Sequence, residues 1–181
     1  EAIHLSGLFI DRGVIVQVKD ADGNIQPYND TDRGSTWEGP LVVLNSRLSA
    51  SASEILAGAI QDYGRGIIVG DDTTHGKGTV QSLLDLGSQL IRTPNPPNLG
   101  ALKITMQQFY RPAGDSTQKR GVLSDIALPS LFNHMDGAES DLDFALEFDK
   151  VAKGEFARLP LATAEIISQL RKTSTQRIAQ S

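Results

Sequence analysis

The stretch from Pro40 to Gly70 constrains the fold more than any other part of the sequence. It begins with an uninterrupted apolar run, "PLVVLN" (40–45), which is typical of a strand buried on both faces. Apolar residues at helical spacing follow in "ASEILAGAIQDYG", and "GIIVG" (66–70) predicts a second buried strand. A strand, a helix and a strand in succession form a βαβ unit, in which the two strands run parallel. We therefore predict an α/β fold.

The segments around this unit predict further strands and helices. Residues 1–10 have the pattern of a helix segment, and a loop or weak hairpin is expected around Asp22-Gly23. The prolines in "SQLIRTPNPPNLG" indicate a surface loop. Further strands are expected at 13–18, 79–86 and 101–111.

The character of the sequence changes near Ser140. Both "ESDLDFALEFDKVA" and "TAEIISQLRKTSTQRI" have helical periodicity, and Thr163 is a suitable N-cap for the second. We therefore expect a core over residues 1–139 and a C-terminal helical segment over 140–181.

Composition excludes several classes of protein. A chain of 181 residues that is 39% hydrophobic and 22% charged has the make-up of a soluble globular domain. The net charge of −5 argues against a nucleic-acid partner. There is no cysteine, so disulfide and thiol chemistry are excluded, and no apolar run is long enough to span a bilayer.

Three serines alternate with alanines directly before the predicted helix, in "SRLSASASEI" (46–55). One serine is enough for a cap, and Ser51 followed by Glu54 fits the capping-box pattern S-x-x-E. A turn from strand to helix also places a side chain above a helix N-terminus, where free N–H groups can stabilise an oxyanion. Taken alone, this stretch favours capping over nucleophilic catalysis.

A second stretch, "HGKGTVQ" (75–81), shifts the balance toward catalysis. Lys77 lies between two glycines, which suggests close approach of the backbone to other groups. In an apolar pocket beside a serine, burial would favour the neutral amine, which can act as a general base. Gln81 could then hold the lysine in place without stabilising its charged form. A solvated lysine is the usual interpretation of such a residue taken singly.

Other sites are weaker interpretations of the same loop. "GDDTTHGKGT" (70–79) resembles a phosphate-binding loop, but it has one residue too many before the Gly-Lys pair, and Gly78 occupies the position of the required hydroxyl. His75 ranks second to Lys77 as the base for a serine. Asp71, Asp72 and His75 form only a weak metal-binding pattern, so we predict no metal.

The two catalytic stretches together closely resemble the carboxy-terminal processing, or tail-specific, serine peptidases. "SRLSASASEILAGAIQDYGRGIIVG" followed by "HGKGTVQ" carries the resemblance, which "GPLVVLNS" and "ITMQQFYRPAGDSTQKRGVLSDI" extend. It covers Ala2 to about Val151 and is greatest for the periplasmic tail-specific branch. The loop before the lysine is one residue longer than is usual in the family.

The resemblance implies a role for each matching residue. Ser51 matches the nucleophile of a Ser–Lys dyad, Lys77 the general base and Gln81 the residue that orients it. The N–H of Ala52 would form half of the oxyanion hole. Asp62 matches an acidic helix residue that is implicated in some members, although a solvated carboxylate at a helix end is the simpler interpretation.

The resemblance also implies a crotonase/Clp-protease-like core, polypeptide substrates, no cofactor and a periplasmic location. On the same ground, an adaptor lipoprotein and an oligomer are candidate partners. Family members carry a PDZ domain and a glycine-rich turn ahead of the part that matches residues 1–10, so we expect these 181 residues to be an incomplete catalytic unit. The alternative is a catalytically inactive peptide-binding or scaffold module on the same core.

Overall fold

The computed structural model describes residues 1–180. None of the helices in this range combines the length and apolarity that a membrane crossing requires. The helices are α1 (Ala2–Gly7), α2 (Ala52–Asp62), α3 (Leu86–Leu90) and α4 (Ala164–Ile178), with short 3₁₀ helices η1 (Leu131–His134) and η2 (Glu139–Asp141). The strands are β1 (Val14–Lys19), β2 (Ile25–Asn29), β3 (Val42–Asn45), β4 (Ile67–Gly70), β5 (Thr79–Asp85), β6 (Ala101–Tyr110) and β7 (Ile126–Ala127).

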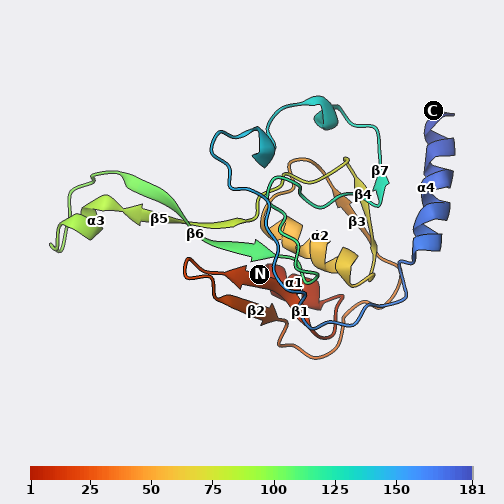
Figure 1. Cartoon of the computed structure of the whole chain (residues 1–181), viewed down its shortest axis with the longest axis horizontal. Coiled ribbons are helices and arrows are strands. Elements are labelled where there is room, and N and C mark those ends of the chain that lie inside the picture. The colour runs from red at the N-terminus through yellow and green to blue at the C-terminus, as the bar shows by residue number, and fades with distance from the viewer. Residues whose placement is uncertain (181) are drawn as a thin grey trace.

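Two sheets and a central helix make up the body of the molecule (Figure 1). One sheet has the strand order β2-β1-β6-β5 and is antiparallel, and the other has the order β3-β4-β7 and is parallel. Helix α2 contacts β1 of the first sheet and β4 of the second, and α1 packs on α2. The main core gathers there from Ile10, Ile15, Ala57, Ala59, Ile60, Tyr63, Ile68 and Val122.

The predicted βαβ unit is confirmed. Strand β3 leads into α2 and then into β4, and β3 and β4 pair in parallel with Val42 opposite Ile67. The expectation that β3 is buried on both faces is wrong, because Val42 is 56% exposed and Leu44 is 77% exposed. Strand β3 is an edge strand, and no other segment within residues 1–180 covers the face that carries Val42 and Leu44.

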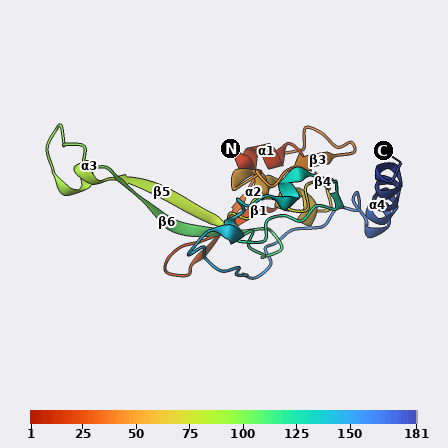
Figure 2. The ribbon, with the colours of Figure 1, turned by 90° about the horizontal axis from the view of Figure 1, so that it is seen from above.

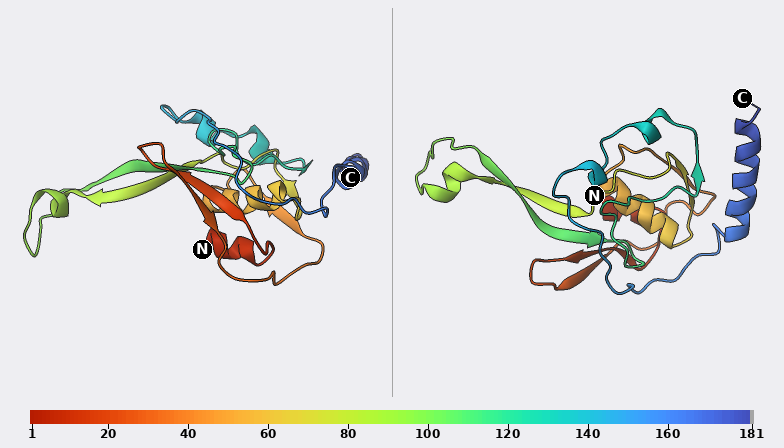
Figure 3. Two further views of the ribbon diagram at one scale, coloured as in Figure 1. Left: turned by 60° about the horizontal axis from the view of Figure 1, so that its bottom comes forward. Right: turned by 45° about the horizontal axis from the view of Figure 1, so that its top comes forward.

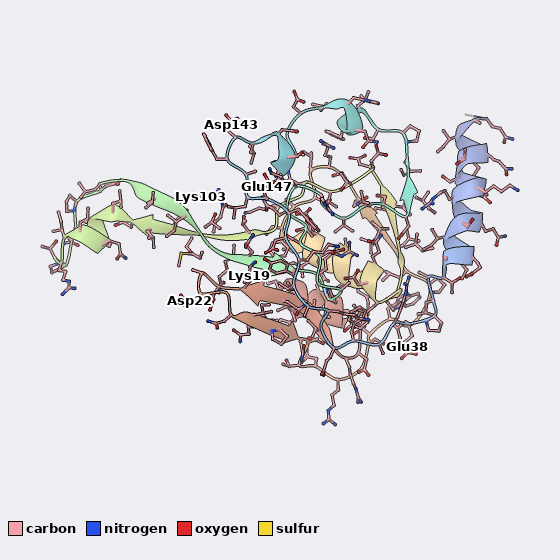
Figure 4. The ribbon with its side chains drawn as sticks, viewed as in Figure 1. Lys19, Asp22, Glu38, Lys103, Asp143 and Glu147 are labelled. Atoms are coloured by element: carbon pink, nitrogen blue, oxygen red, sulfur yellow. The ribbon has the colours of Figure 1, made fainter. Side chains whose placement is uncertain are left out.

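Strands β5 and β6 form a long hairpin arm that leaves the body of the molecule (Figure 2). At its base Thr79 is only 4% exposed, whereas Leu83 further out is 72% exposed. The proline-rich loop lies at the tip, where α3 forms within part of the segment expected to be irregular. In the side-chain view, Lys103 lies out along this arm and Lys19 lies at the body (Figure 4).

One of the two helices predicted for the C-terminal part is present. Helix α4 forms, and the Thr163 hydroxyl accepts the N–H of Ile166 at 3.4 Å. The helix expected across "ESDLDFALEFDKVA" is absent apart from η2. Main-chain groups of this segment form hydrogen bonds with the core instead, as where the N–H of Val151 donates to the carbonyl of Gly114 at 2.9 Å. These tertiary contacts outweigh the helical pattern of the sequence. Figure 3 shows this segment running along the body before α4.

Candidate active site

A cavity of about 380 Å³ opens between the start of α2, helix α1 and the base of the arm. Four of the residues singled out from the sequence, Ser51, Ala52, Lys77 and Gln81, line it together. Its other walls are mostly apolar: Glu1, Ala2, Ile3, Val16, Val18, Tyr28, Ile55, Thr79, Val80 and Phe109. The fold therefore brings the serine-rich turn and the lysine loop to one site, although about 25 residues separate them in the chain.

Ser51 occupies a backbone conformation that few residues adopt. It is the N-cap of α2, with φ 54° and ψ −107°. A positive φ at a non-glycine residue costs of order 1–3 kcal/mol and is often retained where a side chain must be presented to a ligand. Within residues 1–180 the N–H of Ala52, the first helical residue, has no hydrogen-bond partner. This N–H is therefore available to an oxyanion in the cavity.

Glu54 holds the serine turn and the lysine loop together. Its side chain is fully buried. One carboxylate oxygen accepts the N–H of Ser51 at 2.8 Å and of Lys77 at 3.0 Å, and the other accepts the Thr74 hydroxyl at 2.5 Å and the N–H of Gly76 at 2.7 Å. Burial raises the pKa of Glu54 above its ordinary value, and the four donors offset part of that rise.

Residues 116–119 hold the lysine loop from the opposite side. The Gln118 side chain accepts the N–H of Gly78 at 2.8 Å, and the Thr117 hydroxyl donates to the carbonyl of Lys77 at 2.9 Å. A Cβ atom at Gly78 would lie 2.6 Å from the Ser116 hydroxyl oxygen, closer than real Cβ contacts come. The glycines beside Lys77 therefore permit close backbone approach, as the sequence indicated.

The half-buried Lys77 and the exposed Gln81 both reach the cavity. Within residues 1–180 no hydrogen bond joins the Lys77 amine to the Ser51 hydroxyl, and catalytic contacts are often long in the absence of substrate. Gln81 follows an irregularity in the β5–β6 ladder, where the register shifts by one residue between Val80 and Gln81. Bulges of this kind re-aim side chains next to functional sites.

The competing residues in this loop point elsewhere. His75 is directed at Glu139, with Nε2 at 3.4 Å from the carboxylate, and it does not line the cavity. Asp71 accepts the N–H of Arg47 at 2.7 Å. Within residues 1–180, Asp71, Asp72 and His75 do not form a group with metal-ligand spacing.

Asp62 lies at the far end of α2, about 16 Å along the helix axis from Ser51. Its carboxylate binds the guanidinium of Arg111 and accepts the N–H of Ala113 at 2.9 Å. Both side chains of the ion pair are largely buried, with 8% of Asp62 and 15% of Arg111 exposed. The simpler interpretation, a solvated carboxylate, therefore does not describe this residue, and its contacts are those of a structural ion pair.

Replacing Asp62 by alanine should lower the free energy of unfolding by about 3–5 kcal/mol, because Arg111 would stay buried without its partner. Chemical denaturation of the variant and the wild type measures this difference. Replacing both partners, with Asp62→Ala and Arg111→Met, should recover part of the loss. Equal stability of the Asp62→Ala variant and the wild type would contradict the structural role.

Sequence reasoning missed the residues that position the catalytic candidates. The sequence marks Glu54 only as part of the helix start, and it does not single out Thr117 or Gln118. Their polar side chains accept or donate in contacts that join segments 20 to 40 positions apart, as between Glu54 and Thr74 or Gln118 and Gly78. The S-x-x-E pattern was the one available signal, and it points to the Ser51 contact alone.

Comparisons with known proteins identify the family. The model of "Peptidase family S41" matches residues 1–128. The chain is 45% identical over 156 residues to the tail-specific protease of Haemophilus influenzae, covering 86% of this chain and 22% of that protein. It is 32% identical over 155 residues to the carboxyl-terminal-processing protease of a Picosynechococcus species, covering 84% of this chain and 34% of the relative. The chain belongs to peptidase family S41.

The fold agrees with this assignment. The solved structure of the photosystem II D1 C-terminal processing protease matches 70% of this chain with a TM-score of 0.56 and 34% identity. The match covers 30% of that structure. The mixed α/β fold predicted from the sequence is therefore confirmed as similar to that of a C-terminal processing protease. The chain spans about a fifth to a third of the length of these relatives.

Proposed function

We propose that the chain carries the catalytic residues of a serine endopeptidase that cleaves polypeptides near their C-termini. The observation that supports this most directly is the meeting of Ser51 and Lys77 at one cavity, with Glu54 bonded to the main chain of both. A capping serine and a solvated lysine would need neither the strained turn nor the shared carboxylate.

In this mechanism Lys77 takes the proton of the Ser51 hydroxyl as its oxygen attacks the scissile carbonyl carbon. The tetrahedral intermediate places its oxyanion at the N–H of Ala52, at the positive end of α2. The C–N bond then breaks as Lys77 gives the proton to the leaving amine, and the acyl group stays on Ser51 as an ester. Lys77 next takes a proton from a water molecule that attacks this ester, and returns it to Ser51 as the new carboxyl end is released. Gln81 orients the lysine without adding a negative charge that would hold it protonated.

The substrate would bind as an extended strand. Strand β5 is an edge strand, and Thr79, Val80 and Gln81 at its start line the cavity next to Ser51. An added strand could therefore pair with β5 and bring its scissile bond to the serine. The apolar walls formed by Ile3, Ile55 and Phe109 suit an aliphatic side chain beside that bond.

A serine-directed phosphonylating probe tests this proposal in the whole protein. The probe should attach at Ser51, as peptide mapping by mass spectrometry would show, and Lys77→Ala should suppress the labelling. The alternative function, an inactive peptide-binding or scaffold module, predicts peptide binding without labelling. Labelling of Ser51 at the same rate with and without Lys77 would remove the lysine from the mechanism.

The remaining proposals follow from the family. They are a periplasmic location, a PDZ domain elsewhere in the protein, and an adaptor lipoprotein or oligomeric partner. We also propose that residues 1–139 belong to the protease core and that residues 140–181 form the C-terminal segment. The packing of Ile167 beside Ile67 and Ile126, and the bonds from Arg171 to the carbonyl of Asp125, would then dock α4 on the core.

A further inference from the structure

A buried carboxylate outside the active-site cavity has no adequate partner. The Asp30 side chain, just after β2, is only 2% exposed, and its Oδ1 has no hydrogen-bond partner. The nearest basic atom is Nδ1 of His4, at 3.6 Å, which is beyond hydrogen-bond distance. Burying an unpaired carboxylate is costly, so the arrangement calls for a positive charge.

Two further ligand groups converge on Asp30. His4 of α1 also lies 4.0 Å from a carboxylate oxygen of Asp32, through the same Nδ1 atom. One donor atom from each of His4, Asp30 and Asp32 falls within 4.8 Å of the others. No Lys or Arg ion pair satisfies Asp30 or Asp32 within residues 1–180.

The backbone leaves room for this carboxylate. A Cβ atom at Gly7 would lie 2.0 Å from Oδ2 of Asp30, so only glycine lets the aspartate pack against α1. The other two ligands remain open to solvent, with 67% of the His4 side chain and 80% of the Asp32 side chain exposed. The Asp30 carboxylate is therefore held in place, whereas the exposed side chains of His4 and Asp32 have room to move toward an ion.

We propose that His4, Asp30 and Asp32 bind a divalent transition-metal ion such as Zn²⁺. An imidazole nitrogen and two carboxylate oxygens are a donor set for Zn²⁺ or Mn²⁺ rather than for Mg²⁺ or Ca²⁺, which prefer oxygen ligands alone. Bonds of about 2.1 Å in a tetrahedral site separate the donors by about 3.4 Å, close to the 3.6 and 4.0 Å observed. Water would complete the coordination.

The ion would be structural rather than catalytic. It would join α1 to the end of β2, and these two elements contribute Ile3 and Tyr28 to the wall of the candidate active site. Binding should therefore stiffen one side of the cavity without placing the ion among Ser51, Lys77 and Gln81.

Titration calorimetry with Zn²⁺ on the 181-residue chain, freed of metal by a chelator, tests the site. We expect one bound ion, with the affinity about tenfold or more lower in His4→Ala and in Asp32→Asn. Two matched controls should bind as the wild type does: His134→Ala, and Asp22→Asn in the β1–β2 turn (Figure 4), because neither residue belongs to the cluster. Lack of Zn²⁺ binding, or binding that is unchanged in His4→Ala and Asp32→Asn, would overturn the proposal.

Asp30→Asn separates a metal site from a structural aspartate. Removing an unpaired buried charge should leave the melting temperature of the metal-free chain equal or higher, and should abolish its increase on addition of Zn²⁺. Hydrogen exchange should slow at the amides of α1 when Zn²⁺ is added to the wild type and stay unchanged in Asp30→Asn. A metal-free variant that melts well below the wild type and still responds to Zn²⁺ would refute the assignment of Asp30.

Discussion

Replacing Ser51 by alanine should abolish peptide-bond cleavage by the whole protein and leave the fold intact. The change removes the attacking oxygen, and the half-buried position of Ser51 accepts alanine without a cavity or a clash. Lys77→Ala should have a similar effect, because the hydroxyl then has no base. Each variant should lose about 10⁴-fold or more in kcat/KM, measured with an unfolded polypeptide substrate.

The neighbouring serine supplies the control. Ser53 lies two positions further on, and its hydroxyl donates to the carbonyl of Ala50 at 2.8 Å in an exposed part of the turn. Ser53→Ala is the same serine-to-alanine substitution in the same motif, and it should keep kcat/KM within a few-fold of the wild type. Circular dichroism of all three variants checks that they are folded. Normal turnover by Ser51→Ala or Lys77→Ala would refute the dyad.

The local pattern of the sequence predicts the elements that are neighbours in the chain and pack against one another. The apolar runs of β3 and β4 and the periodicity of α2 are sufficient to predict the parallel unit, because each element buries its own apolar stripe. The same logic fails for 142–152, where main-chain bonds to distant segments such as Gly114 replace the helix that the pattern favours. It also fails for the exposure of β3, which depends on what packs against that strand.

The candidate catalytic residues can be singled out from local motifs, whereas the residues that hold their loops in place cannot. Ser51 and Lys77 each lie in a short stretch whose small neighbours mark it as unusual. The partners of Gln118 and Arg111 are defined only once the chain has folded, since Gly78 lies 40 positions from the first and Asp62 lies 49 positions from the second. No spacing rule connects such pairs. For this reason the sequence associates Asp62 with catalysis by family resemblance, and the structure pairs it with Arg111.

Glu54→Gln should damage both stability and catalysis. All four groups that face the carboxylate are donors, and the amide of glutamine would turn its own N–H atoms toward two of them. Each buried donor that loses its acceptor costs about 1–3 kcal/mol, so the loss of two should lower the free energy of unfolding by about 2–6 kcal/mol. The turn at Ser51 and the loop at Lys77 would lose their common acceptor, so kcat should fall more than the affinity for substrate.

The pH dependence distinguishes this carboxylate from an ordinary helix-start glutamate. Burial raises the folded-state pKa of Glu54 above its ordinary 4.5, so the folded state binds this proton more tightly than the unfolded state does. The stabilisation that results is fully present below pH 4.5 and is lost as the pH rises through the raised pKa. Urea denaturation across this range should show the loss in the wild type and not in Glu54→Gln. Glu165→Gln makes the same substitution in the exposed first turn of α4 and should leave both stability and turnover near wild-type values. If Glu54→Gln matched Glu165→Gln in stability and kcat, the four bonds to Glu54 would have no part in holding the serine and the lysine at one site.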